Sequence, residues 1–278
     1  MTAPHVVILT VTTNAAGHLP AYLAALDGLT YPNWTLWVVD NASGDGSAAL
    51  VREHMPAATV IENETNIGFT GACNRALECL LARPDVDFVL FLNDDTEATP
   101  GFIEPLVARA TGGRLVAPKT YLAGQPGILD DSVGDFDWWR GTWKRRVLGR
   151  REGARDSQSH TVTNANLSAL LVPLRVFEDV GLLDDAFFVY YDDTDFCRRA
   201  LDVGYEIWFE PESIVYHRKG ATLGGQVSLF GCYYLSRNRP YLMRKHLSWP
   251  RFGVFAAYYL ATRSARMALW LREGRRDL

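Results

Sequence analysis

The chain has 278 residues, a length that suits one large domain or one and a half. Hydrophobic residues make up 48% and charged residues 22%, which excludes a disordered composition, and the net charge of -4 argues against nucleic acid as the main partner. The four cysteines lack a CxxC spacing, so we interpret them as free thiols in a reducing cytosol. We find no secretory leader and no run of about 18 apolar residues, and therefore expect a cytoplasmic protein without a transmembrane helix.

The first 120 residues alternate strand-like and helix-like patterns. Apolar runs rich in β-branched residues predict strands, and apolar residues at helical spacing predict helices. In chain order we expect strand 5–13, helix 19–29, strands 35–40 and 58–62, helix 71–82, strand 87–93, helix 100–110 and strand 114–118. Strands that alternate with helices imply a parallel sheet with helices on both faces, and ligands of such sheets bind beyond the carboxyl ends of the strands.

The remainder of the chain is less regular. Residues 120–160 are rich in aromatic and charged residues and predict a long loop or small excursion. Further along we expect strand 165–173, helix 192–204, strands 205–211 and 213–217, and helices from residue 226 onward.

Three polar residues, Asn93, Asp94 and Asp95, end the apolar run DFVLFLN. A turn or a helix N-cap explains adjacent acids about as well as a ligand does. However, Thr99 and Pro100 can begin the next helix without them. Carboxylates at this edge of a sheet can hold a divalent cation that binds a diphosphate, and hard oxygen ligands suit Mg²⁺ or Mn²⁺.

A second acidic group lies in VYYDDTDFCRR, at the start of a predicted helix. Acids favour helix N-termini through capping and the helix dipole, and Asp192 as the cap with Asp195 as the dipole partner satisfies that explanation. Asp193 is then surplus, and it follows aromatic residues. A carboxylate in a partly desolvated pocket can have a pKa suited to a general base, so we favour Asp193, with Asp192 as the alternative.

His217 ends the strand SIVYH and precedes Arg218 and Lys219. A lone histidine is more often structural than a metal ligand. Next to two cations that suit a phosphate, it can also supply a metal ligand.

Two glycine-rich segments, VVDNASGDGS (38–47) and NIGFTGACN (66–74), follow predicted strands but match neither GxGxxG nor the P-loop. Asp40 suits the imide N–H of a pyrimidine, and Asn66 or Asn74 suits a ribose or a phosphate. As ordinary turns, these segments would need no ligand.

Together these segments resemble the family 2 glycosyltransferases of the GT-A fold, in particular a bacterial rhamnosyltransferase-like branch. The resemblance depends on the order VVDNASGDG, NIGFTGACN, FLNDDT, GLLDDAFFVYYDDTDFCRR and VYH, and it extends to YYLSRNRPYLMRKH (233–246). It implies an α/β fold with a GT-A (Rossmann-like) mixed sheet flanked by helices. Residues 1–220 would form the catalytic domain, with an acceptor-side excursion at about 120–160, and residues 221–278 a C-terminal helical extension.

The resemblance also implies residue roles. Asp95 and His217 would be metal ligands for Mg²⁺ or Mn²⁺, Asp193 the catalytic base and Asp192 an acceptor contact. TNANLSALLV (163–172) departs from the family's usual Gly-Ala stretch, at a place that bears on the donor sugar. The residues expected to bind the nucleotide-sugar donor are Thr10, Thr12, Asn14, Asp40, Asn41, Asn66, Gly68, Asn74, Asn93 and Asp94.

The acceptor side is assigned to FDWWRGTWKRR (136–146), where Trp138 and Trp139 offer flat faces for sugar rings. Packing of a loop explains these tryptophans equally well. The C-terminal segment mixes aromatic residues with arginines, which fits a packed or oligomeric helix and fits a peripheral helix at the inner face of a membrane equally well.

The implied function is an inverting, metal-dependent transfer of sugar from a UDP- or dTDP-sugar, dTDP-rhamnose among them, to a hydroxyl of a saccharide, lipid-linked or small-molecule acceptor. Such a reaction belongs to bacterial polysaccharide, glycolipid or glycosylated-metabolite synthesis. Two alternatives remain: a sugar nucleotidyltransferase and a non-catalytic module that binds nucleotide or carbohydrate. The segment TVTTNAAGHLP lacks the cation that the nucleotidyltransferases carry after their first strand.

Overall fold

The computed structural model describes residues 2–144, 148–218 and 228–272. Nine strands of these residues form one sheet. Eight of them lie in a single row, and the ninth, β5 (Thr96–Ala98), pairs with a strand of that row without being part of it. The order of those eight is β10 (His160–Val162), β13 (Ile207–His217), β6 (Leu115–Leu122), β12 (Ala169–Pro173), β4 (Phe88–Leu92), β1 (Val6–Thr12), β2 (Trp34–Asp40) and β3 (Thr59–Glu62).

The sheet is mixed. Strands β1 to β4 run parallel to one another, and β6 runs parallel to β13. Strand β12 lies antiparallel between β4 and β6, while β10 and β5 pair antiparallel with β13. The predicted α/β fold with a mixed sheet is confirmed, whereas the expectation of a parallel sheet holds only for part of it.

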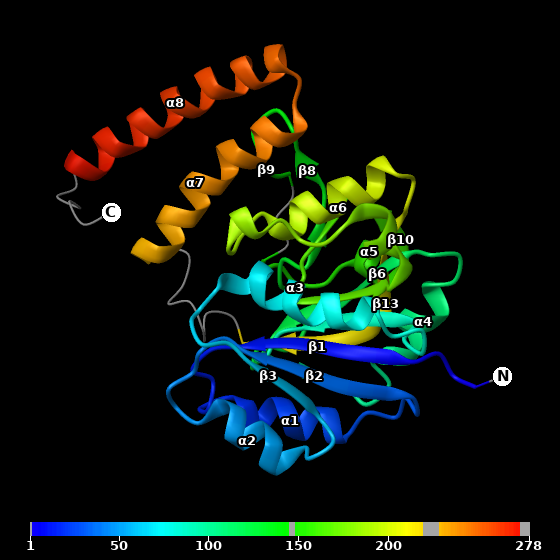
Figure 1. Cartoon of the computed structure of the whole chain (residues 1–278). Coiled ribbons are helices and arrows are strands. Elements are labelled where there is room, and N and C mark those ends of the chain that lie inside the picture. Colours follow the sequence, from blue (N-terminus) through cyan, green and yellow to red (C-terminus); the bar gives the residue numbers. More distant parts are fainter. Residues whose placement is uncertain (1, 145–147, 219–227, 273–278) are drawn as a thin grey trace.

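Helices cover both faces of the sheet, as Figure 1 shows. Successive side chains of a strand point to opposite faces. In β1, Val7 and Leu9 therefore join one apolar core, and Val6 and Ile8 join the other. The first core is covered by α3 (Gly68–Leu81), α5 (Arg175–Val180) and α6 (Asp192–Asp202), and the second by α1 (Leu19–Asp27), α2 (Ser47–His54) and α4 (Ile103–Arg109).

The excursion at 120–160 is not one long loop. It contains short pairings whose two-residue strands are too brief to leave a periodic pattern in the sequence. These elements are β7 (Val133–Gly134), which pairs with β11 (Asn164–Ala165), β8 (Phe136–Asp137), which pairs with β9 (Thr142–Trp143), and the 3-10 turn η1 (Ala154–Ser157). The two strands expected at 205–211 and 213–217 are a single strand, β13, whose register shifts between Glu210 and Ile214, around Pro211.

The chain ends in α7 (Leu229–His246) and α8 (Trp249–Arg272), which lie beyond α6 in Figure 1. Pro240 lies inside α7 and has no N–H to donate to the carbonyl of Ser236. The hydroxyl of Tyr259 in α8 donates to that carbonyl instead, at 2.9 Å. A third apolar cluster, which includes Phe136, Phe187 and Phe255, joins the two helices to the excursion and to the segment that precedes α6. No helix in the described ranges combines the length and the hydropathy that crossing a bilayer requires.

Candidate active site

Acidic and histidine side chains meet where β4 and β13 end. Strand β5 follows Asp95 directly and pairs with β13, with Thr96 opposite His217. This pairing places the imidazole Nε2 of His217 3.1 Å from Oδ1 of Asp95. Asp95 is only 7% exposed. The two residues predicted as metal ligands, 122 positions apart in the chain, are therefore neighbours.

The other imidazole nitrogen of His217 contacts Asp130, whose Oδ2 lies 2.6 Å from Nδ1. Burial lowers the pKa of His217, but the hydrogen bonds to Asp130 and Asp95 outweigh burial and raise the pKa to about 9. A carboxylate on the second nitrogen fixes the orientation of the ring, as it does for many metal-binding histidines. Asp130 was not predicted from the sequence, because it lies in the irregular excursion.

His18 is a further residue that the sequence analysis missed. It precedes α1, and its Nε2 lies 3.3 Å from Oδ1 of the buried Asp94. The hydrogen bond to Asp94 raises the pKa of His18, and burial opposes this only in part. The signal in the sequence was its position just after the first strand, at the edge where ligands of such sheets bind.

The residues at this edge fit a divalent cation only in part. In the described ranges, no group of three or more His, Cys, Asp or Glu side chains is arranged to hold a metal ion. Asp95 and His217 offer one carboxylate oxygen and one imidazole nitrogen, which suit Mn²⁺ or Mg²⁺ when a diphosphate supplies further oxygens. Oδ2 of Asp94 is buried beside them and accepts no hydrogen bond from any described residue. Such an atom indicates a missing partner.

The glycine-rich segments form a network of asparagine side chains. Asn41 donates through Nδ2 to Oδ1 of Asn66 at 2.9 Å, and accepts through Oδ1 from the backbone N–H of Ile67. Asn14 accepts from the backbone of Gly44 at 2.8 Å. At the end of β2, Oδ1 of Asp40 accepts from the backbone of Ser43, while Oδ2 is buried without a hydrogen bond to described residues. That oxygen is the atom available to a ligand.

Of the other residues predicted to bind the donor, Thr10, Asn74 and Asn93 have hydrogen bonds within the protein and the hydroxyl of Thr12 has none to a described residue. Thr10 donates to the carbonyl of Leu92 at 2.9 Å and also bonds the hydroxyl of Tyr22. Asn74 donates to the carbonyl of Leu183 at 2.8 Å and accepts from the N–H of the same residue. Through its backbone N–H, Asn93 donates to the carbonyl of Ser168. Thr12 ends β1, and its Oγ1 is buried without a hydrogen bond in the described chain.

Two neighbouring acids begin α6. The N-cap position belongs to Tyr191, in a left-handed conformation with φ 67°, and Asp192 is the first helical residue. The prediction that Asp192 caps the helix is therefore wrong, because a left-handed cap residue turns the chain into the helix without a side-chain cap. Burial raises the pKa of Asp192, as does the neighbouring charge of Asp193. Burial also raises the pKa of Asp193, whose Oδ1 accepts from the backbone N–H and the hydroxyl of Thr194.

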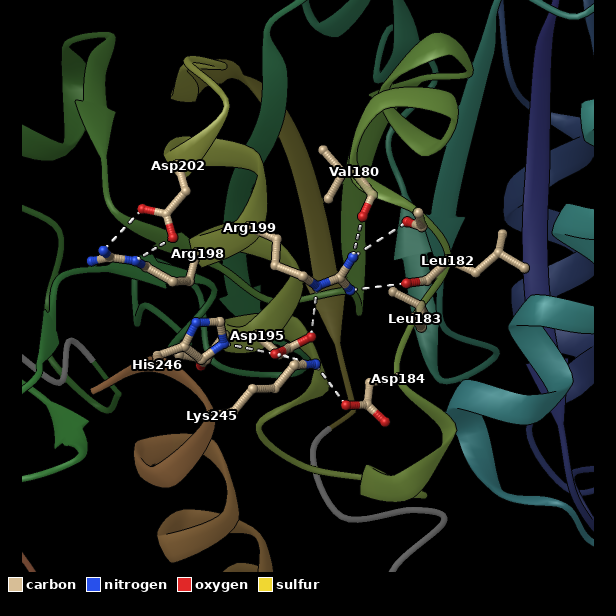
Figure 2. A network of polar contacts seen from close by, with 12 residues as sticks. Val180, Leu182, Leu183, Asp184, Asp195, Arg198, Arg199, Asp202, Lys245 and His246 are labelled. Atoms are coloured by element: carbon tan, nitrogen blue, oxygen red, sulfur yellow. Dashed lines mark hydrogen bonds and ion pairs between the residues drawn. The ribbon is translucent and has the colours of Figure 1, made fainter. Parts of the chain in front are cut away.

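Asp195 has a different environment, shown in Figure 2. Its side chain is fully buried and lies 2.9 Å from Arg199, 2.8 Å from Lys245 and 2.7 Å from His246. Burial would raise the pKa of Asp195, but His246, Arg199 and Lys245 lower it to about 2. Lys245 also pairs with Asp184, so this network joins α6 to α7. Asp195 therefore serves the structure.

One segment, residues 164–168, contacts both α6, which begins with Asp192 and Asp193, and the end of β4, which precedes Asp94 and Asp95. At one end, Sγ of Cys197 in α6 accepts from the backbone N–H of Ala165. At the other end, the carbonyl of Ser168 accepts from Asn93 beside the β4 acids. Between them, Asn166 donates to the carbonyl of Asp131, next to the partner of His217. Asn164 is fully buried, and neither polar atom of its side chain bonds a described residue. A polar group in this state favours a binding site between the two groups of acids.

The two predicted acceptor tryptophans differ in burial. Trp138 packs edge-on against Phe136, with ring centroids 4.8 Å apart, and Arg198 lies over its ring at 5.2 Å. Trp139 is 67% exposed. Packing thus accounts for Trp138, while Trp139 has Arg251 of α8 at 6.0 Å from its ring centroid and leaves most of its surface exposed. Arg145 and Arg146 of the same segment lie outside the described residues.

Comparison with known proteins identifies one family profile and several relatives of the same enzyme class. The sequence profile of the family described as Glycosyl transferase family 2 matches residues 7–163, more than half of the chain. Over 267 residues, the chain is 25% identical to the N-acetylglucosaminyl-diphospho-decaprenol L-rhamnosyltransferase of Mycobacterium tuberculosis (strain CDC 1551 / Oshkosh), an alignment that covers 88% of this chain and 86% of the relative.

Two solved structures have a similar fold. GalNAc-T7 with UDP, GalNAc and Mn²⁺ superposes with a TM-score of 0.62 and 15% identity, over 84% of this chain and 47% of that chain, so this chain spans about half of its length. S. aureus TarS 1–349 in complex with UDP gives a TM-score of 0.59 and 16% identity, over 91% of this chain and 70% of that chain. At such identities the similarity shows the fold alone, which is the GT-A arrangement.

Proposed function

Because this chain belongs to glycosyl transferase family 2, we propose that it is an inverting, metal-dependent enzyme that moves a sugar from a nucleoside diphosphate to an acceptor hydroxyl. The observation that carries the proposal is the pair of acidic groups on either side of residues 164–168. One group, Asp94 and Asp95 with His217, suits a cation and a diphosphate. The other, Asp192 and Asp193, suits a proton acceptor.

On the donor side, Asp95 and His217 would hold Mg²⁺ or Mn²⁺, with Asp94 beside the ribose or the diphosphate. A structure of the same fold, GalNAc-T7, was solved with UDP and Mn²⁺, which supports this choice of cofactor. When bound, such a cation stabilises the negative charge that grows on the departing nucleoside diphosphate. Asp40 would accept a hydrogen bond from the base through its available Oδ2.

On the acceptor side, Asp193 takes the proton of the attacking hydroxyl. The hydroxyl oxygen forms a bond to the anomeric carbon from the face opposite the diphosphate, and the bond to the diphosphate breaks with its electron pair. A single in-line displacement inverts the anomeric centre. The raised pKa of Asp193 supports this role, since a carboxylate with a raised pKa is a stronger base.

The donor that we propose to test first is dTDP-L-rhamnose, because the relative of Mycobacterium tuberculosis is named a rhamnosyltransferase. That relative is also named for a diphospho-decaprenol substrate, so an acceptor linked to a polyprenyl diphosphate is the class that we favour.

A lipid-linked acceptor requires access to a membrane surface, and α7 with α8 offers a suitable face. Residues 229–272 contain no acidic residue, although the whole chain carries -4, and α8 alone carries Arg251, Arg263, Arg266 and Arg272. Large apolar side chains of α8 are exposed, among them Leu260 at 65%, Met267 at 59% and Leu271 at 59%. Exposed apolar residues interspersed with cations favour the interface of an anionic bilayer.

Vesicle sedimentation tests the membrane contact. The protein should bind vesicles of phosphatidylglycerol, lose binding as salt rises, and not bind phosphatidylcholine. Leu260→Glu should weaken binding, whereas Val203→Glu, at an apolar residue just after α6 that is 56% exposed, should not. If the protein binds neither kind of vesicle at any salt concentration, and light scattering shows a dimer that Leu260→Glu dissociates, this face contacts a second copy of the chain instead.

The transfer itself is tested with a panel of dTDP-, UDP- and GDP-sugars. The preferred donor should raise the melting temperature, and more so with Mn²⁺, because a ligand that binds only the folded state stabilises it. Turnover with that donor should release nucleoside diphosphate, and NMR of the product should show an inverted anomeric configuration. Release of pyrophosphate, or a retained configuration, would refute the proposed reaction.

A further inference from the structure

The segment that leads into α6, residues 187–191, has an unusual backbone. We name it the aromatic turn. Phe188, Tyr190 and Tyr191 have φ values of 66°, 65° and 67°. The N–H of Val189 donates to the carbonyl of Phe187 at 2.7 Å, and with ψ -53° at Phe188 this is a γ-turn of the rare, strained kind. Each such residue costs on the order of 1–3 kcal/mol, so surrounding contacts must hold the turn in this conformation.

Asn238 of α7 supplies those contacts. Its side chain is fully buried, and its Nδ2 lies 2.8 Å from the carbonyl of Phe187, 2.7 Å from that of Val189 and 3.0 Å from that of Tyr190. Its Oδ1 accepts from Nε of Arg237 at 2.8 Å, which fixes the amide with its nitrogen toward the turn. One amide therefore contacts three carbonyls of a strained five-residue segment.

The opposite side of the aromatic turn is held by α3. The carbonyl of Phe188 accepts from the backbone N–H of Phe69 at 2.7 Å. The ring of Phe188 stacks on Tyr234 of α7, with centroids 4.9 Å apart. The turn is thus clamped between the start of α3, on the proposed donor side, and α7. Its last residue, Tyr191, immediately precedes Asp192 and Asp193.

From these contacts we propose that Asn238 is a positioning residue, which fixes the aromatic turn and thereby aims Asp193 at the acceptor hydroxyl. The inference rests on the proposed function, in which Asp193 is the base. The body of α6 is held by the Asp195 network, which reaches the last turn of α7 and does not involve Asn238, so the contribution of Asn238 is confined to the turn and the first residues of the helix. A displacement of about 1 Å at a reacting group can lower turnover about a hundredfold.

The first test is structural and needs no substrate. In hydrogen–deuterium exchange of the whole chain, Asn238→Ala should speed exchange in peptides that cover 186–194 and leave β1 and β4 unchanged. Tyr259→Phe is the matched control, since it also removes one hydrogen bond to α7, at Ser236, without touching a carbonyl of the turn. Unchanged exchange at 186–194 in Asn238→Ala would overturn the proposal.

The second test is kinetic, with dTDP-L-rhamnose as the donor probe and its hydrolysis or transfer as the readout. Asn238→Ala should lower kcat tenfold or more, because the base is displaced from the acceptor hydroxyl. The donor KM should stay unchanged. Asn238→Gln keeps the amide donor one methylene away, so it should recover part of kcat, and it provides folded protein if the alanine variant does not fold. If the donor KM of Asn238→Ala rises by the same factor as its kcat falls, the role of Asn238 is purely structural. The same conclusion follows if Tyr259→Phe lowers kcat as much as Asn238→Ala does.

The two tests separate this proposal from the proposed function. If the wild-type protein turns over no nucleotide sugar but Asn238→Ala still loosens 186–194, the function is wrong and the clamp on the turn stands. If the wild-type protein is active and Asn238→Ala loosens the turn without lowering kcat, the positioning role is wrong.

Discussion

Asp193 and Asp195 lie two residues apart in the first turn of α6, and their carboxyl groups have opposite electrostatic surroundings. Burial raises the pKa of Asp193, whose hydrogen-bond donors are the neutral N–H and hydroxyl of Thr194. For Asp195 the effect of burial is reversed by His246, Arg199 and Lys245, and the pKa falls to about 2. One helix end thus carries an acid suited to accept a proton and an acid that stays charged.

Asp193→Asn should lower turnover by about 10²- to 10⁴-fold, the usual contribution of a general base, while binding of the nucleoside diphosphate stays the same. The same change should raise the melting temperature near neutral pH. The folded-state pKa of Asp193 lies above its ordinary value of 3.8, so its charged form destabilises the fold as pH rises from the ordinary value through the raised one. The gain of the variant should therefore be larger at about pH 8 than at about pH 5.

Calorimetry and initial rates on the same samples check both parts of this prediction. Asp202→Asn, at the exposed end of α6, should change neither quantity by much. A wild-type rate in Asp193→Asn would remove Asp193 from the role of base and leave Asp192 as the alternative.

Asp195→Asn should destabilise the protein by about 3 kcal/mol, because it leaves the partly buried Arg199 and Lys245 without the carboxylate that they share. The folded-state pKa of Asp195 is depressed to about 2. Its contribution is therefore present above its ordinary value of 3.8 and is lost as pH falls through about 2. The difference from wild type in urea unfolding should be full near neutral pH and smaller in acid.

Asp202→Asn is the matched control for this network, since Asp202 pairs with Arg198 in the same helix at the same i, i+4 spacing but at the surface. Exposed pairs of this kind contribute about 0.5 kcal/mol or less. Equal effects of the two substitutions would contradict the stabilising role assigned to the buried network.

His217→Ala should abolish the extra stabilisation that Mn²⁺ gives to the complex with nucleoside diphosphate, because the proposed site then keeps only Asp95 of the protein. Asp130→Asn should weaken the effect less, since it removes only the group that orients the imidazole. His160→Ala is the control, as His160 contacts Phe209 and lies on the edge strand β10. A Mn²⁺ effect that survives in His217→Ala would place the cation elsewhere.

Much of the fold was predictable because burial on both faces leaves long apolar runs. Strands β1, β2 and β4 were predicted within one or two residues, since apolar residues predominate in each. The antiparallel direction of β12 was not visible, because an apolar run carries no sign of direction. Helices α2 and α5, which are only 8 and 6 residues long, were missed for lack of periodic positions.

The site was predictable in its parts more than in its arrangement. The resemblance selected Asp95 and His217, and the structure brings them together, while their role as metal ligands stays a prediction. Asp130 could not be found, because it lies 87 positions from His217 in a stretch without regular structure. Asp192 was wrongly predicted as the N-cap of α6, because the N-cap is Tyr191 in a left-handed conformation. Aromatic residues rarely adopt a left-handed φ, so the sequence pattern does not indicate it.

The two tryptophans of the excursion should separate packing from acceptor binding. Trp138→Ala should destabilise the protein by about 3 kcal/mol, because its ring packs on Phe136 and under Arg198. Trp139→Ala should leave stability within about 0.5 kcal/mol and raise the acceptor KM, with donor hydrolysis unchanged. An unaltered acceptor KM in Trp139→Ala, measured with a polyprenyl-diphosphate-linked sugar, would remove the acceptor role from this exposed face.

Gly68 should be irreplaceable for a reason that lies in the aromatic turn. It has φ 80°, and a Cβ atom there would lie 2.5 Å from the ring of Phe188 and 2.7 Å from its carbonyl oxygen. Gly68→Ala should therefore destabilise the protein by about 2–4 kcal/mol, measured by urea unfolding. At Gly44, in the other glycine-rich segment, a Cβ would meet nothing within 4 Å, so Gly44→Ala should change stability by about 0.5 kcal/mol or less. Equal tolerance at both positions would mean that Phe188 does not pack on Gly68, and would weaken the clamp on which the position of Asp193 depends.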